Sequence, residues 1–219
     1  MTAKIKLNAA SGGGSFSLQA PSSSSNNRVF TIPDVADDTI ATNATSGSWK
    51  KLSTTTVSSN VSSLTFTNAI TDAFDTYKMY AIVFNQFSST ADDYNFYIRI
   101  QESGSNVSSG VYRWRVFSPD GNSNGQGDTQ FRCNKDAIGN ATASDNNEDV
   151  SGILYFTGFP SGKRLRYRSE IMFGTASSDN NADFSGGGIN NLNETTGVVF
   201  FPQNGDWSTG TATLYGIAQ

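Results

Sequence analysis

The sequence predicts an all-β protein: an antiparallel β-sandwich, jelly-roll-like, preceded by an extended N-terminal arm of short strands. Short runs of aromatic and β-branched residues recur between clusters of Ser, Asp, Gly and Asn, which form turns. Aromatic residues make up 12% of the chain and charged residues only 16%. No stretch of useful length shows the period of an amphipathic helix. These observations favour many short strands over helices.

The densest supply of core-forming residues lies between residues 75 and 117. Three runs stand out there, Met79–Phe84, Tyr94–Ile100 and Val111–Phe117, and we expect them to pair as an antiparallel meander. In the second run the even-numbered residues are aromatic or aliphatic and alternate with Asn, Tyr, Arg and Gln. Alternation of this kind predicts a strand with one buried face.

Further strands are expected along the rest of the chain, at Leu64–Phe66, Ile153–Phe156, Leu165–Phe173, Val198–Phe201 and Ala212–Ile217. In the third of these, apolar residues occupy one face, and Arg166 and Arg168, with Arg164 just before the strand, occupy the other. Residues 118–128 and 134–149 are rich in Gly, Asn and Asp, so they are expected to be loops. The last strand is expected to close the sandwich.

The chain is expected to have three regions. Residues 1–47 form an attachment or oligomerisation arm, residues 48–60 a Ser/Thr-rich linker, and residues 61–219 the sandwich, or knob. Gly12–Gly14 is expected to be a hinge. Three short strands cannot bury a core by themselves, so the arm is expected to pack against a partner, with a disordered tail as the alternative. Its apolar contact positions are Ile5, Leu7, Phe16, Leu18, Phe30 and Ile32.

The net charge and the hydropathy of the chain limit the classes of partner that it is expected to bind. The net charge is −4, from 15 basic and 19 acidic residues, which argues against a nucleic-acid-binding surface. No apolar run approaches the ~18 residues of a membrane span, so no membrane insertion is expected. The N-terminus lacks the apolar core of a signal peptide, which predicts synthesis in the cytoplasm without export. The single cysteine, Cys133, excludes an intrachain disulfide.

The residue inventory favours a non-enzymatic protein. Histidine is absent, which removes the commonest general base and most zinc sites. The acidic pairs at 37–38, 92–93 and 148–149 would suit a glycosidase, but they fall in turn sequence. We therefore expect no catalytic residue, no cofactor and no metal. One weak calcium-loop candidate is Asp120, Asn122 and Asn124, where the acidic ligand expected at the twelfth position is Phe131. A glycine-rich turn is the alternative.

Two sets of residues are candidates for binding a glycan or a neighbouring subunit. Arg164, Arg166 and Arg168 form a cationic strand face that suits an anionic glycan or another subunit's carboxylates. The alternative is a charged strand that simply faces solvent. Tyr97 and Trp114, with Tyr112, are expected to be exposed and able to stack on sugar rings, although aromatic residues in strands more often belong to the core.

Several segments together resemble a known family. "DTYKMYAIVF", "NFYIRIQESGS" and "VYRWRV" are similar to successive strands of a domain that recurs in marine bacteriophage virion proteins. "STGTATLYGI" near the end resembles the closing strand of that domain. "GGGSFSLQAPSSSSNNRVFTIPD" resembles a module near the front of phage fibre-type proteins. The positions that match the first two strand patterns are Tyr77, Tyr80, Ile82, Phe84, Phe96, Ile98, Arg99, Ile100, Gly104 and Ser105.

The resemblance implies a non-enzymatic virion structural protein of a bacteriophage. The arm would anchor it to capsid or tail proteins, and the knob would be displayed outward, with possible recognition of a host-surface glycan. A short tail or head fibre is favoured, and a homotrimer is implied, as in other fibre proteins. A capsid-stabilising decoration protein and a carbohydrate-binding module that uses the loops 118–128 and 134–149 are the alternatives.

Overall fold

The structure is a computed structural model that describes residues 4–8, 11, 13, 15–19, 49–67, 77–139, 149–159, 164–175, 180–189 and 195–217. The chain divides into two compact units, Met1–Ala41 and Thr42–Gln219, each of which is described by itself.

The first unit contains a β-hairpin. β1 (Lys4–Asn8) pairs antiparallel with β2 (Ser15–Gln19), so Ile5 lies opposite Leu18 and Leu7 opposite Phe16 in the backbone register. Gly13, in the connection, has a φ of +69°, a left-handed conformation that glycine adopts without steric cost. Gly13, at the centre of the predicted hinge, therefore lies in the connection between two strands that pair with each other. Phe30 and Ile32, in the third expected strand, lie outside the described residues.

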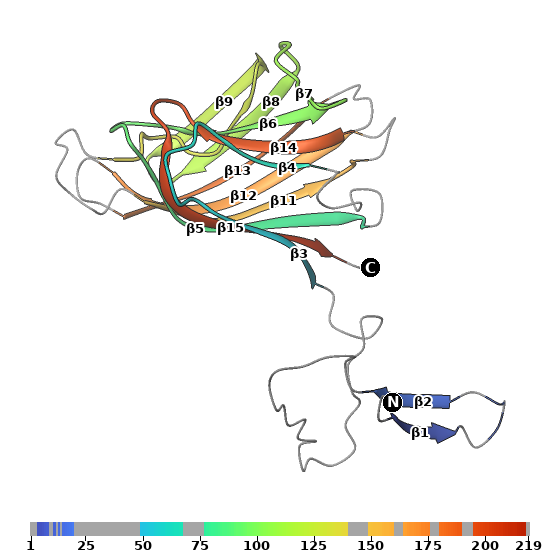
Figure 1. Cartoon of the computed structure of the whole chain (residues 1–219). Helices are drawn as coiled ribbons and strands as arrows, with labels where there is room; N and C mark the ends of the chain where they lie inside the picture. Colours follow the sequence, from blue (N-terminus) through green and yellow to red (C-terminus); the bar gives the residue numbers. More distant parts are fainter. Residues whose placement is uncertain are drawn as a thin grey trace. The chain divides into compact units, whose positions relative to one another are not determined.

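The second unit is a sandwich of two antiparallel sheets, which Figure 1 shows as stacked layers. The larger sheet has the order β3–β15–β5–β11–β12–β13–β8–β9. The smaller sheet has the order β10–β6–β14–β4, with the short β7 paired to β6. The strands of the larger sheet are β3 (Trp49–Thr56), β15 (Trp207–Ile217), β5 (Met79–Ser89), β11 (Val150–Thr157), β12 (Leu165–Gly174), β13 (Asn180–Ile189), β8 (Tyr112–Ser118) and β9 (Gly121–Asp128). Those of the smaller sheet are β10 (Phe131–Arg132), β6 (Phe96–Glu102), β14 (Thr195–Pro202), β4 (Leu64–Thr67) and β7 (Ser105–Asn106).

The pairing is nested, which confirms the predicted fold class. β3 pairs with β15, β4 with β14, β5 with β11, and β6 with β10. Successive strands from β3 to β6 alternate between the two sheets, so the chain folds back on itself in the strand order of a jelly roll. β12, β13, β8 and β9 extend the larger sheet beyond β11.

The core between the sheets is aromatic. Trp207 is fully buried, and its ring lies 5.2 Å from Phe87 and 5.8 Å from Phe96, measured between ring centroids. The indole N–H of Trp207 donates to the carbonyl of Phe200 at 3.3 Å, which satisfies its one polar group. Burial alternates along β6 and β12 as the sequence predicts. Large rings from both sheets therefore compensate for the small number of aliphatic residues.

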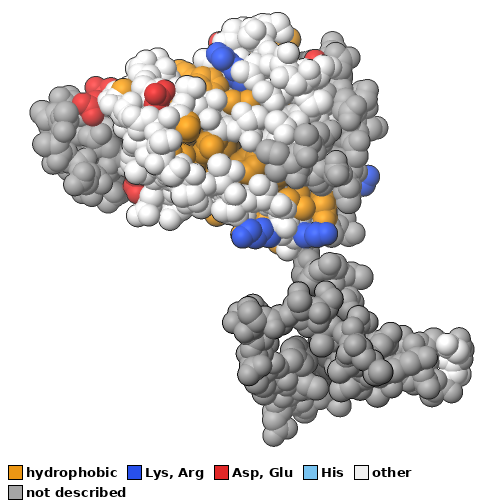
Figure 2. Space-filling model, viewed as in Figure 1, with side chains coloured by type: hydrophobic (Ala, Val, Ile, Leu, Met, Phe, Trp, Pro, Cys, Tyr) orange, Lys and Arg blue, Asp and Glu red, His pale blue; other side chains and the backbone are white. Residues whose placement is uncertain are grey.

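Uncharged groups dominate the visible surface. On the side shown in Figure 2, hydrophobic side chains form a diagonal band among mainly uncharged polar atoms, and a few acidic groups lie toward one end. No helix within the described ranges is long and apolar enough to cross a membrane.

Three predictions about the strands are wrong. The runs at 75–117 do form strands, but β5 and β8 belong to the larger sheet and β6 to the smaller one, so they do not form a meander. The expected linker contains β3, which pairs with β15 and is joined to it by hydroxyl contacts, Thr54–Thr213 at 3.0 Å and Thr56–Thr211 at 3.1 Å. The expected loop at 118–128 contains β9. β3 and β9 are the two edge strands of the larger sheet. They are held mainly by backbone pairing, which cannot be recognised from a hydrophobic pattern.

Candidate functional site

The larger sheet has one face turned away from the smaller sheet, and we call it the outer face. It carries all five of the large hydrophobic side chains that are exposed in the described residues. Phe117 (49% exposed) lies opposite Phe184 (54%) on neighbouring strands, and Val83 (38%) lies opposite Ile153. The other two exposed side chains are Trp49 (44%) and Met172 (63%). An apolar concentration on one sheet face is unusual for a surface that meets only water.

Beside this apolar part, the outer face carries four exposed arginines. Arg113 and Arg115 come from β8, and Arg166 and Arg168 come from β12. The strand between them, β13, presents only glycine on this face at these positions. Gly186 is opposite Arg115 on one side and Arg168 on the other, and Gly188 is opposite Arg113 and Arg166 in the same way. We call this set the arginine groove.

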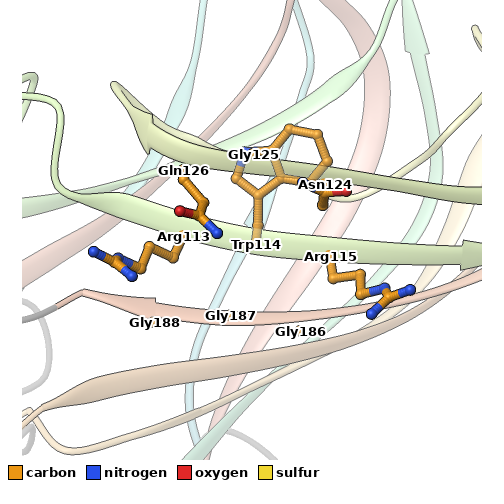
Figure 3. A pocket seen from close by; sticks show the side chains of 9 residues that line it. All are labelled: Arg113, Trp114, Arg115, Asn124, Gly125, Gln126, Gly186, Gly187 and Gly188. Carbon is orange, nitrogen blue, oxygen red and sulfur yellow. The ribbon is translucent and has the colours of Figure 1, made fainter.

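The groove is a hollow because its floor has no side chains. A cavity of about 460 Å³ is lined by Arg113, Trp114, Arg115, Asn124, Gly125, Gln126 and Gly186–Gly188. In Figure 3, Arg113 and Arg115 extend from β8 toward β13, whereas the indole of Trp114 extends toward β9. By the register of β9, Asn124 and Gln126 lie opposite Arg115 and Arg113 and share their face. The floor is therefore bare backbone, and the walls are cationic and amide groups.

Lack of space explains two of the three glycines, and one of these is Gly188, where a Cβ would lie 2.8 Å from the carbonyl oxygen of Leu165. A Cβ on Gly187 would lie 2.1 Å from the carbonyl oxygen of Arg113 and 2.9 Å from a ring carbon of Tyr167, so no side chain fits there. A Cβ on Gly186 would come no closer than 3.5 Å to any atom, an ordinary contact. Core packing thus requires Gly187, whereas packing alone does not require the bare floor at Gly186.

The positive charge of the groove is largely uncompensated. Arg168 forms an ion pair with Glu170 at 2.8 Å, and both side chains are well exposed, so the pair is weak. The guanidinium of Arg115 lies 5.0 Å from the ring of Phe117, and that of Arg168 lies 4.9 Å from the ring of Tyr155. Within the described ranges, the other three groove arginines have no ion pair.

An aromatic platform adjoins the groove. A second hollow of about 370 Å³ is lined by Met79, Tyr155, Thr157, Arg166, Tyr167 and Arg168. Trp49 packs edge-on against Tyr155 and Tyr215, with ring centroids 6.2 Å and 5.7 Å away. Arg166 and Arg168 line this second hollow, and by the register of β13 they lie across Gly188 and Gly186 from Arg113 and Arg115. The aromatic rings therefore continue the surface of the groove toward β3.

The predicted binding residues fall on different surfaces. Arg166 and Arg168 lie in the groove, and Arg164 is exposed just before β12. Tyr97 is half-buried in the smaller sheet, with its ring 5.8 Å from that of Phe201. Trp114 is half-buried on the inner side of β8, where its indole N–H donates to Asp128 at 2.6 Å. Trp114 also lines the hollow of about 460 Å³ with Arg113 and Arg115, so the structure brings it beside two arginines of the groove, whereas Tyr97 belongs to the other sheet.

The expected exposure of Tyr112 is wrong. Its side chain is fully buried, and its hydroxyl donates to the carbonyl of Val107 at 2.8 Å and accepts from the backbone N–H of Ile100 at 3.0 Å. Burial raises the pKa of Tyr112 to about 12. The arginines take the outer positions of β8, so the intervening aromatic residues point inward.

The calcium-loop candidate is a β-hairpin. Asp120 lies in the turn between β8 and β9, and Asn122 and Asn124 are extended strand residues of β9, opposite Phe117 and Arg115. The ammonium group of Lys135 donates to the carbonyl oxygen of Asp120 at 2.9 Å. Residues of an extended strand cannot surround a single ion with their side chains, as the residues of a calcium-binding loop do. Among the described residues, no three His, Cys, Asp or Glu side chains are grouped closely enough to hold a metal.

Cys133 lies in a buried cluster of hydroxyl groups. Ser169 and Ser185 contact each other at 2.5 Å, and Ser185 donates to the hydroxyl of Tyr167 at 3.1 Å. Burial raises the pKa of the Cys133 thiol far above its usual range, despite hydrogen bonds from the two serines. The thiolate form that a nucleophile requires is therefore strongly disfavoured.

Sequence reasoning missed half of the groove. Arg113 and Arg115 alternate with Trp114 in "YRWRV", and Gly186–Gly188 form a run of three glycines, so both signals are visible in the sequence. That they lie side by side depends on the pairing of β8 with β13, which spans some seventy residues of chain. No protein-family model, curated protein or solved structure matches this chain.

Proposed function

We propose that this chain is a non-enzymatic virion structural protein of a bacteriophage, attached to the particle through its N-terminal arm and displaying the jelly roll. The observation that supports this most strongly is the outer face. Its exposed Phe, Met and Trp side chains are of the types that are enriched in protein–protein interfaces. A protein that works alone in solution gains nothing from such a face, whereas a subunit of a particle buries it against a neighbour.

The fold adds support of a general kind. Jelly rolls are common in viral capsid and lectin domains, although a fold by itself does not fix a function. The positions that resemble phage virion proteins include Tyr80, Ile82 and Phe96, all buried in the core. The resemblance is thus largely one of core-forming positions. The outer face and the N-terminal unit support the proposed function more directly than these core positions do.

The small size of the arm supports a role in attaching the protein to the particle. A hairpin of two five-residue strands is marginally stable in water by itself. We infer that it gains stability by pairing or packing with capsid or tail proteins, or with the arms of two further copies in a trimer. A short tail or head fibre fits an outward-facing knob, and a decoration protein is the alternative if the apolar part of the outer face lies on the capsid.

The test of attachment compares the full chain with residues 42–219. Each is added to particles of the encoding phage that lack this protein, and the bound fraction is measured by co-sedimentation. The full chain is expected to bind saturably, and the truncated chain to remain in solution although circular dichroism shows that it is folded. Equal binding of the two would overturn the arm's role.

A matched pair of variants refines this test. Ile5→Ser combined with Leu18→Ser changes two apolar positions that lie opposite each other in the hairpin register. Lys6→Ser, which changes the polar residue next to Ile5 in β1, is the control. The double variant is expected to lose binding to the particles, and the control to keep it.

A further inference from the structure

We propose that the arginine groove binds a carboxylate-bearing polysaccharide, with its acidic groups on the four arginines and a sugar ring over Gly186. This inference goes beyond the proposed function, because it holds for a particle component and for a free protein alike.

The spacing of the charges points to a ligand with several anionic groups. Two arginines on one strand, two residues apart, are separated by roughly 7 Å, and β8 and β12 lie roughly 10 Å apart across β13. A single carboxylate engages one guanidinium bidentately and cannot span this rectangle. A polymer that carries an acidic group on successive units can engage several at once.

The floor and the walls favour a sugar chain. The bare backbone at Gly186 and Gly188 lets a flat ring approach the sheet closely, and the amides of Asn124 and Gln126 can both donate to and accept from hydroxyl groups. The ring of Tyr155, under the guanidinium of Arg168, extends the surface with an aromatic platform. These are features of a site that holds both hydroxyl and carboxylate groups.

An acidic peptide is disfavoured by the position of the groove. Extended peptides bind most readily at sheet edges, where unpaired backbone groups are available for strand addition. β12, β13 and β8 each pair on both sides, so among the strands of the groove only β9, at the edge of the sheet, has unpaired backbone groups, and these lie on its side away from β8 and the arginines. Nucleic acid is disfavoured by the acidic balance of the whole chain, which has a net charge of −4.

The test uses the full chain and oligogalacturonate as the probe, measured by isothermal titration calorimetry at low and at physiological salt. Fully methyl-esterified oligogalacturonate has the same sugar backbone without the charges and is the matched ligand control. Binding of the acid form that weakens with salt is expected, with at least a tenfold loss on esterification. Binding of both forms with equal affinity, or of neither, would overturn the proposal.

Variants assign the binding to the groove. Arg113→Gln combined with Arg166→Gln removes one guanidinium from each wall, and an affinity loss of at least tenfold is expected. Gly186→Val covers the floor at a position where a Cβ meets only ordinary contacts, so the fold is expected to persist in thermal melts while binding is lost. Lys50→Gln, an exposed charge on β3 at the far edge of the sheet, is the control and should bind like the parent chain.

Two further ligands separate the competing partner classes. Poly-glutamate and single-stranded DNA are titrated under the same conditions. Tighter binding of either than of oligogalacturonate, sensitive to the same groove variants, would replace the polysaccharide with an acidic peptide or a nucleic acid.

Discussion

At the scale of single residues, two neighbouring glycines of β13 serve different purposes. Gly187 faces the core, where Tyr167 and the backbone of β8 leave no room for a Cβ. Gly186 faces outward, where a Cβ has space. A glycine in a strand interior weakens the strand, so a bare outward position is a cost that core packing does not explain. The groove provides a reason for it.

Two alanine substitutions separate these roles. Gly187→Ala is expected to lower the free energy of unfolding by about 2–3 kcal/mol, because the new methyl group overlaps a carbonyl oxygen and an aromatic ring. Gly186→Ala is expected to stay within about 0.5 kcal/mol of the parent. Urea denaturation measures both. Equal destabilisation by the two substitutions would contradict this assignment of their faces.

Tyr112 is expected to make the folded chain less stable at alkaline pH. Its pKa is about 12 in the folded chain because of burial, against 10.0 when exposed. Between these values the unfolded chain loses the phenolic proton while the folded chain keeps it. The free energy of unfolding therefore falls as pH rises from about 10 to 12, by about 2–3 kcal/mol in total from this residue.

The matched variant is Tyr112→Phe, which removes the ionisable group and leaves Tyr167 in place. Its stability at pH 7 is expected to be lower by about 1–2 kcal/mol, because the backbone N–H of Ile100 loses its acceptor. Its decline above pH 10 should be shallower than that of the parent. Parallel declines in denaturant titrations at pH 9, 10 and 11 would rule out this contribution.

At the scale of elements, strands with a strong side-chain pattern could be predicted and weakly patterned strands could not. β6 and β12 alternate buried and exposed residues, so their faces were correct from the sequence. β3, β9 and β13 are rich in Thr, Gly and Asn, and their neighbours hold them by backbone pairing. The pairing partners of β5, β6 and β8 could not be predicted either, because the alternation within a strand does not indicate to which of the two sheets that strand belongs.

β3 offers an experiment on one of these missed strands. Residues 42–219 retain it, and residues 57–219 lack it. Its loss removes the packing of Leu52 on the core and uncovers the edge of β15. This is expected to cost about 2 kcal/mol or more, which corresponds to a melting temperature lower by roughly 4–8 °C. Identical thermal melts would show that residues 49–56 behave as the linker that the sequence first indicated.

At the scale of the whole molecule, the jelly roll positions two kinds of surface on one sheet. The apolar part of the outer face, around Phe117 and Phe184, is suited to burial against a protein neighbour. The arginine groove is suited to a soluble, charged chain. The fold class followed from composition and alternation, but the groove joins residues of β8 and β9 with residues of β12 and β13, two pairs of strands that are far apart in sequence. Only the long-range pairing brings them together.

We propose that the protein is part of a virus particle, which requires that a phage encodes it. Quantitative mass spectrometry of the purified particles of that phage, with the major capsid protein as the internal standard, tests this proposal most directly. We expect the chain to be present at a fixed copy number that survives washing at high salt. Its absence from purified particles, together with its accumulation in the soluble lysate, would contradict the account.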